Sequence, residues 1–101
     1  MTDKEMLELA AKAANQERSF AGDLWSSARG CLWDPLGNDG DAIRLAMRLK
    51  LDIKHLDNGI VAENLKMQSR PYAVESYGEN PLSAVRRAIV RAAAEIGKRG
   101  S

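Results

Sequence analysis

A chain of 101 residues, of which 45% are hydrophobic and 29% charged, has the size and composition of one folded globular domain, residues 1–101. No uncharged apolar run approaches the roughly 20 residues that a membrane-spanning helix needs, and the single cysteine cannot form a disulfide within the chain. The net charge is only +1, but acidic residues predominate up to residue 42 and basic residues after it. This asymmetry raises the question of an anionic partner.

The N-terminal segment predicts a helix from about residue 3 to residue 14. Thr2 and Glu5 have the spacing of a capping box, in which each of the two residues satisfies a free backbone amide of the other. The apolar residues that follow recur at helical spacing and form one stripe toward a core: Met6, Leu9, Ala10 and Ala13. The segment has neither the basic nor the apolar region of a signal peptide, so we expect a cytoplasmic protein.

Residues 15–30 carry the weakest pattern, because short apolar pieces alternate with serine, glycine and charged residues. We expect a hairpin here, with strands near Ser19–Trp25 and Gly30–Trp33. Pro35 then predicts a turn, because proline fixes its own φ and moves Asp34 out of the α region.

A second helix is expected from Asp39 or Gly40 to about Leu49. Arg44 and Arg48 are four residues apart and lie on its predicted outer side. The predicted apolar face contains Ile43, Ala46 and Met47, with Ala42, Leu45 and Leu49 beside them.

From Leu51 the pattern changes from helical to alternating, which is typical of a half-buried strand. Asn58 and Gly59 follow as a hairpin turn signal, the strand resumes at residues 60–62, and a third strand is expected at Tyr72–Tyr77.

The last helix has the clearest start, with Asn80 as N-cap and Pro81 at the first helical position. Its predicted buried stripe contains Leu82, Val85, Ala88 or Ile89, Ala92 and Ile96. The element order α-(ββ)-α-ββ-β-α predicts an α+β domain in which about three α-helices pack on a small antiparallel sheet.

Few residues have the spacing of a catalytic or metal centre. A zinc site needs a cluster of cysteine and histidine, and the chain offers only Cys31 and His55, without paired spacing. The same two residues would have to meet in space to form a nucleophile pair, and nothing local in the sequence brings them together. We therefore expect no metal and no cofactor, and we do not expect an enzyme.

Four oxygen-bearing side chains precede and begin the second helix: Asp34, Asn38, Asp39 and Asp41. Calcium and magnesium accept such ligands, but the order of an EF-hand loop is missing. Helix capping explains the residues more simply, with Asn38 or Asp39 as the cap and Asp41 in the first turn, where a carboxylate opposes the positive end of the helix dipole.

Three arginines of the last helix form its basic face: Arg86, Arg87 and Arg91. They are suited to phosphate groups, so a nucleic acid or a nucleotide is an alternative partner. The solvated face of an amphipathic helix explains the same residues without a ligand. The last helix is equally suited to form a homodimer face.

Three segments look familiar as a set: MTDKEMLELAAKAA, WDPLGNDGDAIRLAMRLKLDI and NPLSAVRRAIVRAAAEIGK. Together they resemble a family of small hypothetical proteins encoded by bacteriophages and prophages of proteobacteria, over a little more than half of the chain. The resemblance implies the cytoplasm of a host bacterial cell and an accessory phage role, and it transfers no catalytic residue. Small phage proteins of this kind often act by binding and blocking a host enzyme or a defence complex.

We therefore expect a non-enzymatic phage accessory protein that binds a host protein or complex, with inhibition of an antiphage defence system as one role. The alternative is a nucleic-acid or nucleotide-binding protein that uses the basic face of the last helix. The predicted protein-binding surface contains Trp33, Asp34, Asn38, Asp39, Asp41, Arg44 and Arg48.

Overall fold

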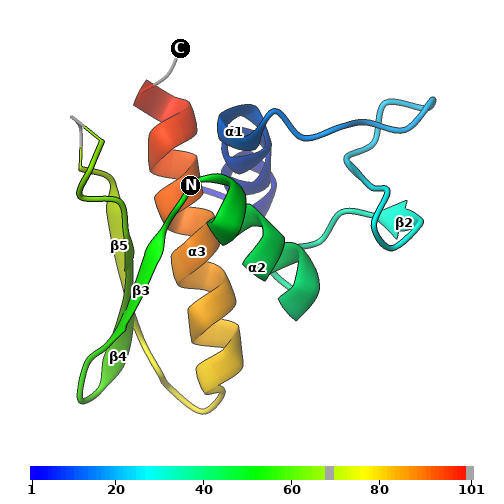
Figure 1. Cartoon of the computed structure of the whole chain (residues 1–101). Coiled ribbons are helices and arrows are strands. Elements are labelled where there is room, and N and C mark those ends of the chain that lie inside the picture. Colours follow the sequence, from blue (N-terminus) through cyan, green and yellow to red (C-terminus); the bar gives the residue numbers. More distant parts are fainter. Residues whose placement is uncertain (68–69, 100–101) are drawn as a thin grey trace.

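The computed structural model describes residues 1–67 and 70–99, and within these ranges it contains three helices and two antiparallel sheets (Figure 1). The helices are α1 (Asp3–Ala14), α2 (Asp39–Arg48) and α3 (Pro81–Arg99). The small sheet pairs β1 (Trp25–Ser26) with β2 (Cys31–Leu32), and the larger sheet has the order β3 (Asp52–His55), β4 (Gly59–Glu63), β5 (Tyr72–Ser76). The expected α+β class and element order are confirmed.

Helix α3 lies at the centre of the fold, with the larger sheet on one side and α1 and α2 on the other (Figure 1). Small residues let α1 cross α3 closely, since Ala10 of α1 and Ala93 of α3 are fully buried. At Gly97 the approach is closest, because an added Cβ atom there would collide with the carbonyl oxygen of Leu9. Thr2 is confirmed as the N-cap of α1, since its hydroxyl accepts from the Glu5 amide at 3.1 Å.

The larger sheet turns one face toward α3 and the other toward solvent. Ile60, Ala62 and Ala73 point to the helices and are buried, whereas Tyr72 and Val74 lie on the open face. The hairpin expected at Asn58-Gly59 is confirmed, with β3 and β4 in antiparallel register. The alternation read from the sequence therefore gives the correct face for these strands.

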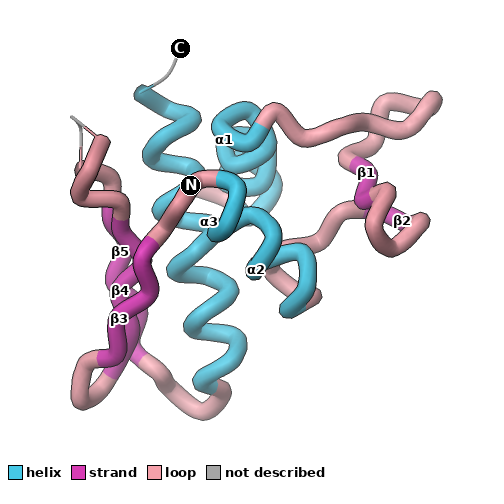
Figure 2. The backbone as a smooth tube through the Cα atoms, viewed as in Figure 1, coloured by secondary structure: helices cyan, strands magenta, loops and turns pink. Residues whose placement is uncertain are grey.

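Residues 15–38 form a segment that we call the arm, which runs out from the end of α1 and returns to the start of α2 (Figure 2). The hairpin expected here is present as the antiparallel β1–β2 pair, and β2 lies within the expected Gly30–Trp33. The expected length of the first strand, Ser19–Trp25, is wrong, because β1 contains only two residues and a single bridge joins Arg18 to Leu24. Gly22 and Gly30 both have positive φ, so the chain turns at these points instead of continuing as strands.

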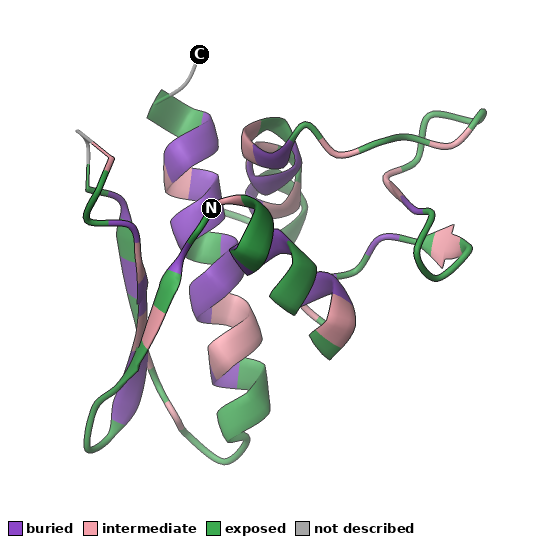
Figure 3. Ribbon diagram, viewed as in Figure 1, coloured by how far each residue is buried: buried purple, intermediate pink, exposed green. Residues whose placement is uncertain are grey.

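Two expectations about buried faces are also wrong. Ile43 and Met47 of α2 are 48% and 72% exposed, because the buried side of this helix is formed by Asp41, Ala42, Leu45 and Ala46. Leu82 is exposed as well, because it lies in the first turn of α3, which extends past the packed centre (Figure 3).

Candidate functional site

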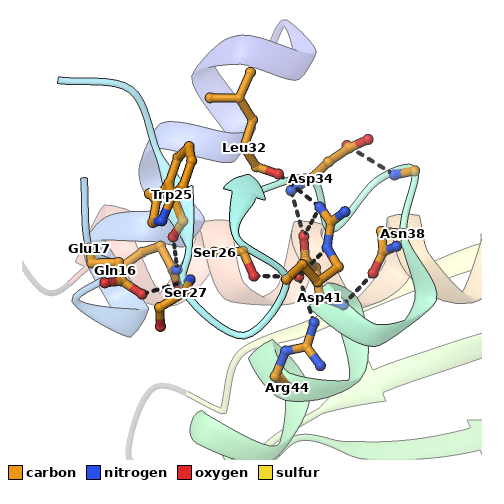
Figure 4. A network of polar contacts seen from close by, with 12 residues as sticks. Gln16, Glu17, Trp25, Ser26, Ser27, Leu32, Asp34, Asn38, Asp41 and Arg44 are labelled. Carbon is orange, nitrogen blue, oxygen red and sulfur yellow. Dashed lines mark hydrogen bonds and ion pairs between the residues drawn. The ribbon is translucent and has the colours of Figure 1, made fainter. Parts of the chain in front are cut away.

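The Asp41 carboxylate is the centre of a polar network that joins the arm to α2 (Figure 4). Its side chain is fully buried. Oδ1 accepts from the Ser26 hydroxyl at 3.2 Å, from Arg29 Nε at 3.1 Å and from Arg44 at 2.8 Å. Oδ2 accepts from Arg29 at 2.7 Å and from the Asp34 amide at 2.8 Å. One carboxylate thus holds three separate points of the arm.

The turn before α2 explains why Asp41 faces inward. The Asp34 carboxylate accepts from the Gly37 amide at 3.1 Å, which closes the turn that Pro35 begins. Asn38 then caps the helix, since its side-chain oxygen accepts from the Asp41 amide at 2.9 Å. The capping expected from the sequence is confirmed, with Asn38 as the cap.

Strong interactions keep Asp41 ionised despite its burial. Burial alone raises the pKa of a carboxyl group, but the hydrogen bonds from Arg29, from the Asp34 amide and from Arg44 outweigh it. The pKa of Asp41 therefore lies well below its usual range, and the same contact raises the pKa of Arg29. Asp41 is a fixed anion that organises the arm and is unsuited to proton transfer near neutral pH.

Arg48 fixes the other end of the arm. Its guanidinium donates to the Ala14 carbonyl at the end of α1, at 3.0 Å, and to the Gln16 side chain at 3.4 Å. Gln16 in turn donates to the Trp25 carbonyl at 2.7 Å. The cavity at this point measures only about 60 Å³, which is space for water and not for a ligand of metabolite size.

The predicted binding residues therefore come together, but mainly to build the arm. Asp34, Asn38, Asp41 and Arg44 share one network, and Trp33 is buried in the core. Asp39 lies apart from the network and pairs with Arg86 at 2.6 Å. Buried Trp33 and Asp41 support a surface without forming part of it.

The three arginines of the alternative site all contact groups of this chain. Arg86 donates to the Leu36 carbonyl at 2.8 Å in addition to its pair with Asp39. The other two both pair with Glu75, and Arg87 also contacts Asp3 at 3.2 Å. These acidic partners offset part of the positive charge on this face of α3.

The arm presents the feature that sequence reasoning missed. Phe20, the one phenylalanine of the chain, is fully exposed at the arm's tip. The tip is ordered by its own hydrogen bonds: the Ser19 amide donates to the Asp23 carbonyl at 2.7 Å and the Gly22 amide to the Ser19 carbonyl at 2.9 Å. Arg18 closes the turn by donating to the Gly22 carbonyl at 2.9 Å. The signal in the sequence is a lone aromatic residue among turn formers, Ser19 to Asp23.

A second apolar element lies further along the arm. Leu32 is exposed and stands opposite the half-buried Trp25 in the β1–β2 pair, so the two side chains share one face of this short ladder. The arm therefore offers an aromatic tip and an apolar pair on a segment held at both ends.

The remaining chemistry is sparse. Within residues 1–67 and 70–99, no group of three histidine, cysteine, aspartate or glutamate side chains is arranged to hold a metal ion. Cys31 is on β2 and His55 on β3, at opposite sides of the molecule (Figure 1), and His55 contacts the Tyr77 hydroxyl at 2.7 Å. Among the helices in these ranges, none combines the length and apolar character of a membrane span.

No family model, curated protein or solved structure matches this chain. The site itself is therefore the basis for a functional proposal.

Proposed function

We propose that this chain is a non-enzymatic protein-binding module and that the arm, residues 15–38, is its binding surface. The observation that carries the proposal is the fully exposed Phe20 on a turn ordered by its own hydrogen bonds. An aromatic side chain left in water forgoes the burial of about 150–250 Å² that it would contribute elsewhere. Phenylalanine is among the residues that are enriched at protein interfaces.

The Asp41 network supports the same proposal. It holds the arm through Ser26, Arg29 and the Asp34 amide, while Arg48 holds the beginning of the arm against α1. A surface that is already ordered loses little conformational entropy when a partner binds. A rigid support below exposed apolar side chains suits a binding function.

A host protein is the partner class that we propose. The resemblance to phage and prophage proteins supports a partner inside a bacterial cell, and the pairing of Arg86, Arg87 and Arg91 with acidic residues favours a protein over a nucleic acid. The exposed apolar side chains of the arm fit a protein surface with an apolar pocket.

The test is affinity capture from a bacterial lysate with the wild type, Phe20→Ala and the control Val74→Ala, followed by titration calorimetry with the purified captured protein. Val74 is exposed on the open face of the larger sheet, outside the arm. If Phe20 anchors the interface, its loss weakens binding by about 30-fold or more, and Val74→Ala leaves binding unchanged. Equal affinity of Phe20→Ala and wild type would refute the assignment of the arm. Circular dichroism verifies that each variant is folded.

A further inference from the structure

One edge of the larger sheet is open. In an antiparallel pair, successive residues point their backbone groups alternately toward the neighbour and away from it. The Leu56 amide donates to the Gly59 carbonyl at 2.8 Å, and Lys54 and Asp52 follow in the same register toward β4. The backbone N–H and C=O groups of Ile53 and His55 therefore point away from the sheet.

The opposite edge differs. Arg91 of α3 donates to the outward carbonyl of Val74 on β5 at 3.1 Å and also pairs with Glu75. A side chain laid along an edge hinders the addition of a further strand. Of the two edge strands, β3 is therefore the one whose outward backbone groups can pair with a further strand.

An apolar groove lies beside this open edge. Ile43 and Met47 on the exposed side of α2 line it with Ile53 of β3, and its volume is about 320 Å³. Ile53 points to the helix side of the sheet, since its partner Ala62 is buried there. A strand added to β3 would place every second side chain into this groove.

The charges on β3 define what can be added. Asp52 and Lys54 are two residues apart and share the open face of the sheet. Lys54 pairs with Glu63 at 2.6 Å, whereas Asp52 stands directly opposite Glu63, a like-charge arrangement that is unfavourable. An incoming strand with a cation opposite Asp52 and an anion opposite Lys54 is therefore complementary.

We propose that a second copy of this chain pairs with β3 in antiparallel register about Ile53, which joins the two larger sheets into one. In this register Asp52 of each copy faces Lys54 of the other, while the two Ile53 residues exchange backbone hydrogen bonds. The His55 amide of each copy reaches the carbonyl of the other copy's Leu51, whose own amide is already bonded to Ala46.

The geometry is consistent with a two-fold axis, because every contact occurs twice. The register that places Ile53 opposite His55 brings Lys54 opposite Lys54 and is disfavoured. In the proposed register, the Ile53 side chains lie on the helix side of the sheet, beside the Ile43 and Met47 side chains, which are exposed to solvent in a single copy. This dimer goes beyond the proposed function, and it leaves the arm free.

Sedimentation velocity over a concentration series, with charge variants of β3, tests the dimer. The variants are Asp52→Lys and Lys54→Asp, and Lys12→Asp on the exposed side of α1 is a control with the same charge change as Lys54→Asp. Each β3 variant alone places like charges opposite each other twice, so we expect its dimer dissociation constant to rise by about 30-fold. An equimolar mixture of Asp52→Lys and Lys54→Asp restores both attractive pairs, and we expect it to form a heterodimer.

Dimeric wild type and Lys12→Asp, weakened single variants and a dimeric mixture would together support the proposal. A wild type that stays monomeric across the series would overturn it. So would single variants that dimerise as tightly as the wild type, or a mixture no tighter than its components. Because the mixture regains dimerisation from the same two variant chains, misfolding of either variant cannot produce the supporting result.

Discussion

Replacement of Asp41 by alanine removes the centre of the network that holds the arm. The carboxylate is fully buried and accepts from Ser26, Arg29, Asp34 and Arg44. Removal of one partner of a buried ion pair costs about 3–5 kcal/mol. The side chains of Arg29 and Arg44 are 28% and 48% exposed and regain water, so we expect the lower end, about 3 kcal/mol.

Urea unfolding measures this loss, and amide hydrogen exchange locates it. We expect the amide of Asp34, which bonds directly to Asp41, and its neighbours in the arm to lose protection by about 100-fold. The central amides of α3 exchange through global unfolding, so their loss of protection corresponds to the change in the free energy of unfolding measured in urea.

Asp39→Ala is the matched control, because Asp39 lies two residues earlier on α2 and its carboxylate is 59% exposed in its pair with Arg86. An exposed pair of this kind contributes about 1 kcal/mol or less. If Asp41→Ala cost no more than Asp39→Ala, or if exchange in the arm were unchanged, the central role of Asp41 would be refuted.

Two further predictions follow from the same structure. The pKa of Asp41 is depressed below its ordinary value of 3.8, so its contribution to stability is complete above that pH and is lost as the pH falls through the folded-state pKa. The difference in unfolding free energy between wild type and Asp41→Asn should therefore narrow between pH 6 and pH 3. Parallel curves of unfolding free energy against pH would contradict this. Gly97→Ala places a methyl group against the Leu9 carbonyl and should lower the melting temperature by about 10 °C through overpacking of α1 on α3, whereas the exposed Ser83→Ala should not; equal melting temperatures would show that the helices can separate without cost.

Local signals in the sequence were sufficient for most of the fold. The Thr2 cap, the Asn80 cap and the alternation of β3 each depend on residues within a few positions of one another. Elements that depend on such short-range chemistry were placed correctly.

The orientation of α2 depended on distant residues and was not predicted. Counting apolar side chains put Ile43 and Met47 inside, but the buried side is organised around Asp41. A carboxylate is stable there only because Ser26 and Arg29, 15 and 12 residues away, converge on it. No periodicity within the helix contains that information.

Contacts between residues distant in sequence also explain why the candidate sites were only partly predicted. Sequence reasoning selected Asp34, Asn38, Asp41 and Arg44, which do come together, but it could not show that their contacts are internal. The basic face of α3 looked free because Asp3, which pairs with Arg87, lies 84 residues away along the chain. The exposure of Phe20 depends on the path of the whole arm.

The most direct test of protein binding by the arm is site-specific photo-cross-linking in bacterial cells, with benzoylphenylalanine in place of Phe20 or, as control, Val74. Both positions are exposed, so differences between them report recognition and not accessibility. The proposed function predicts one dominant cross-linked protein from position 20 that position 74 does not give. The absence of any cross-link from position 20, or the same products from both positions, would contradict it.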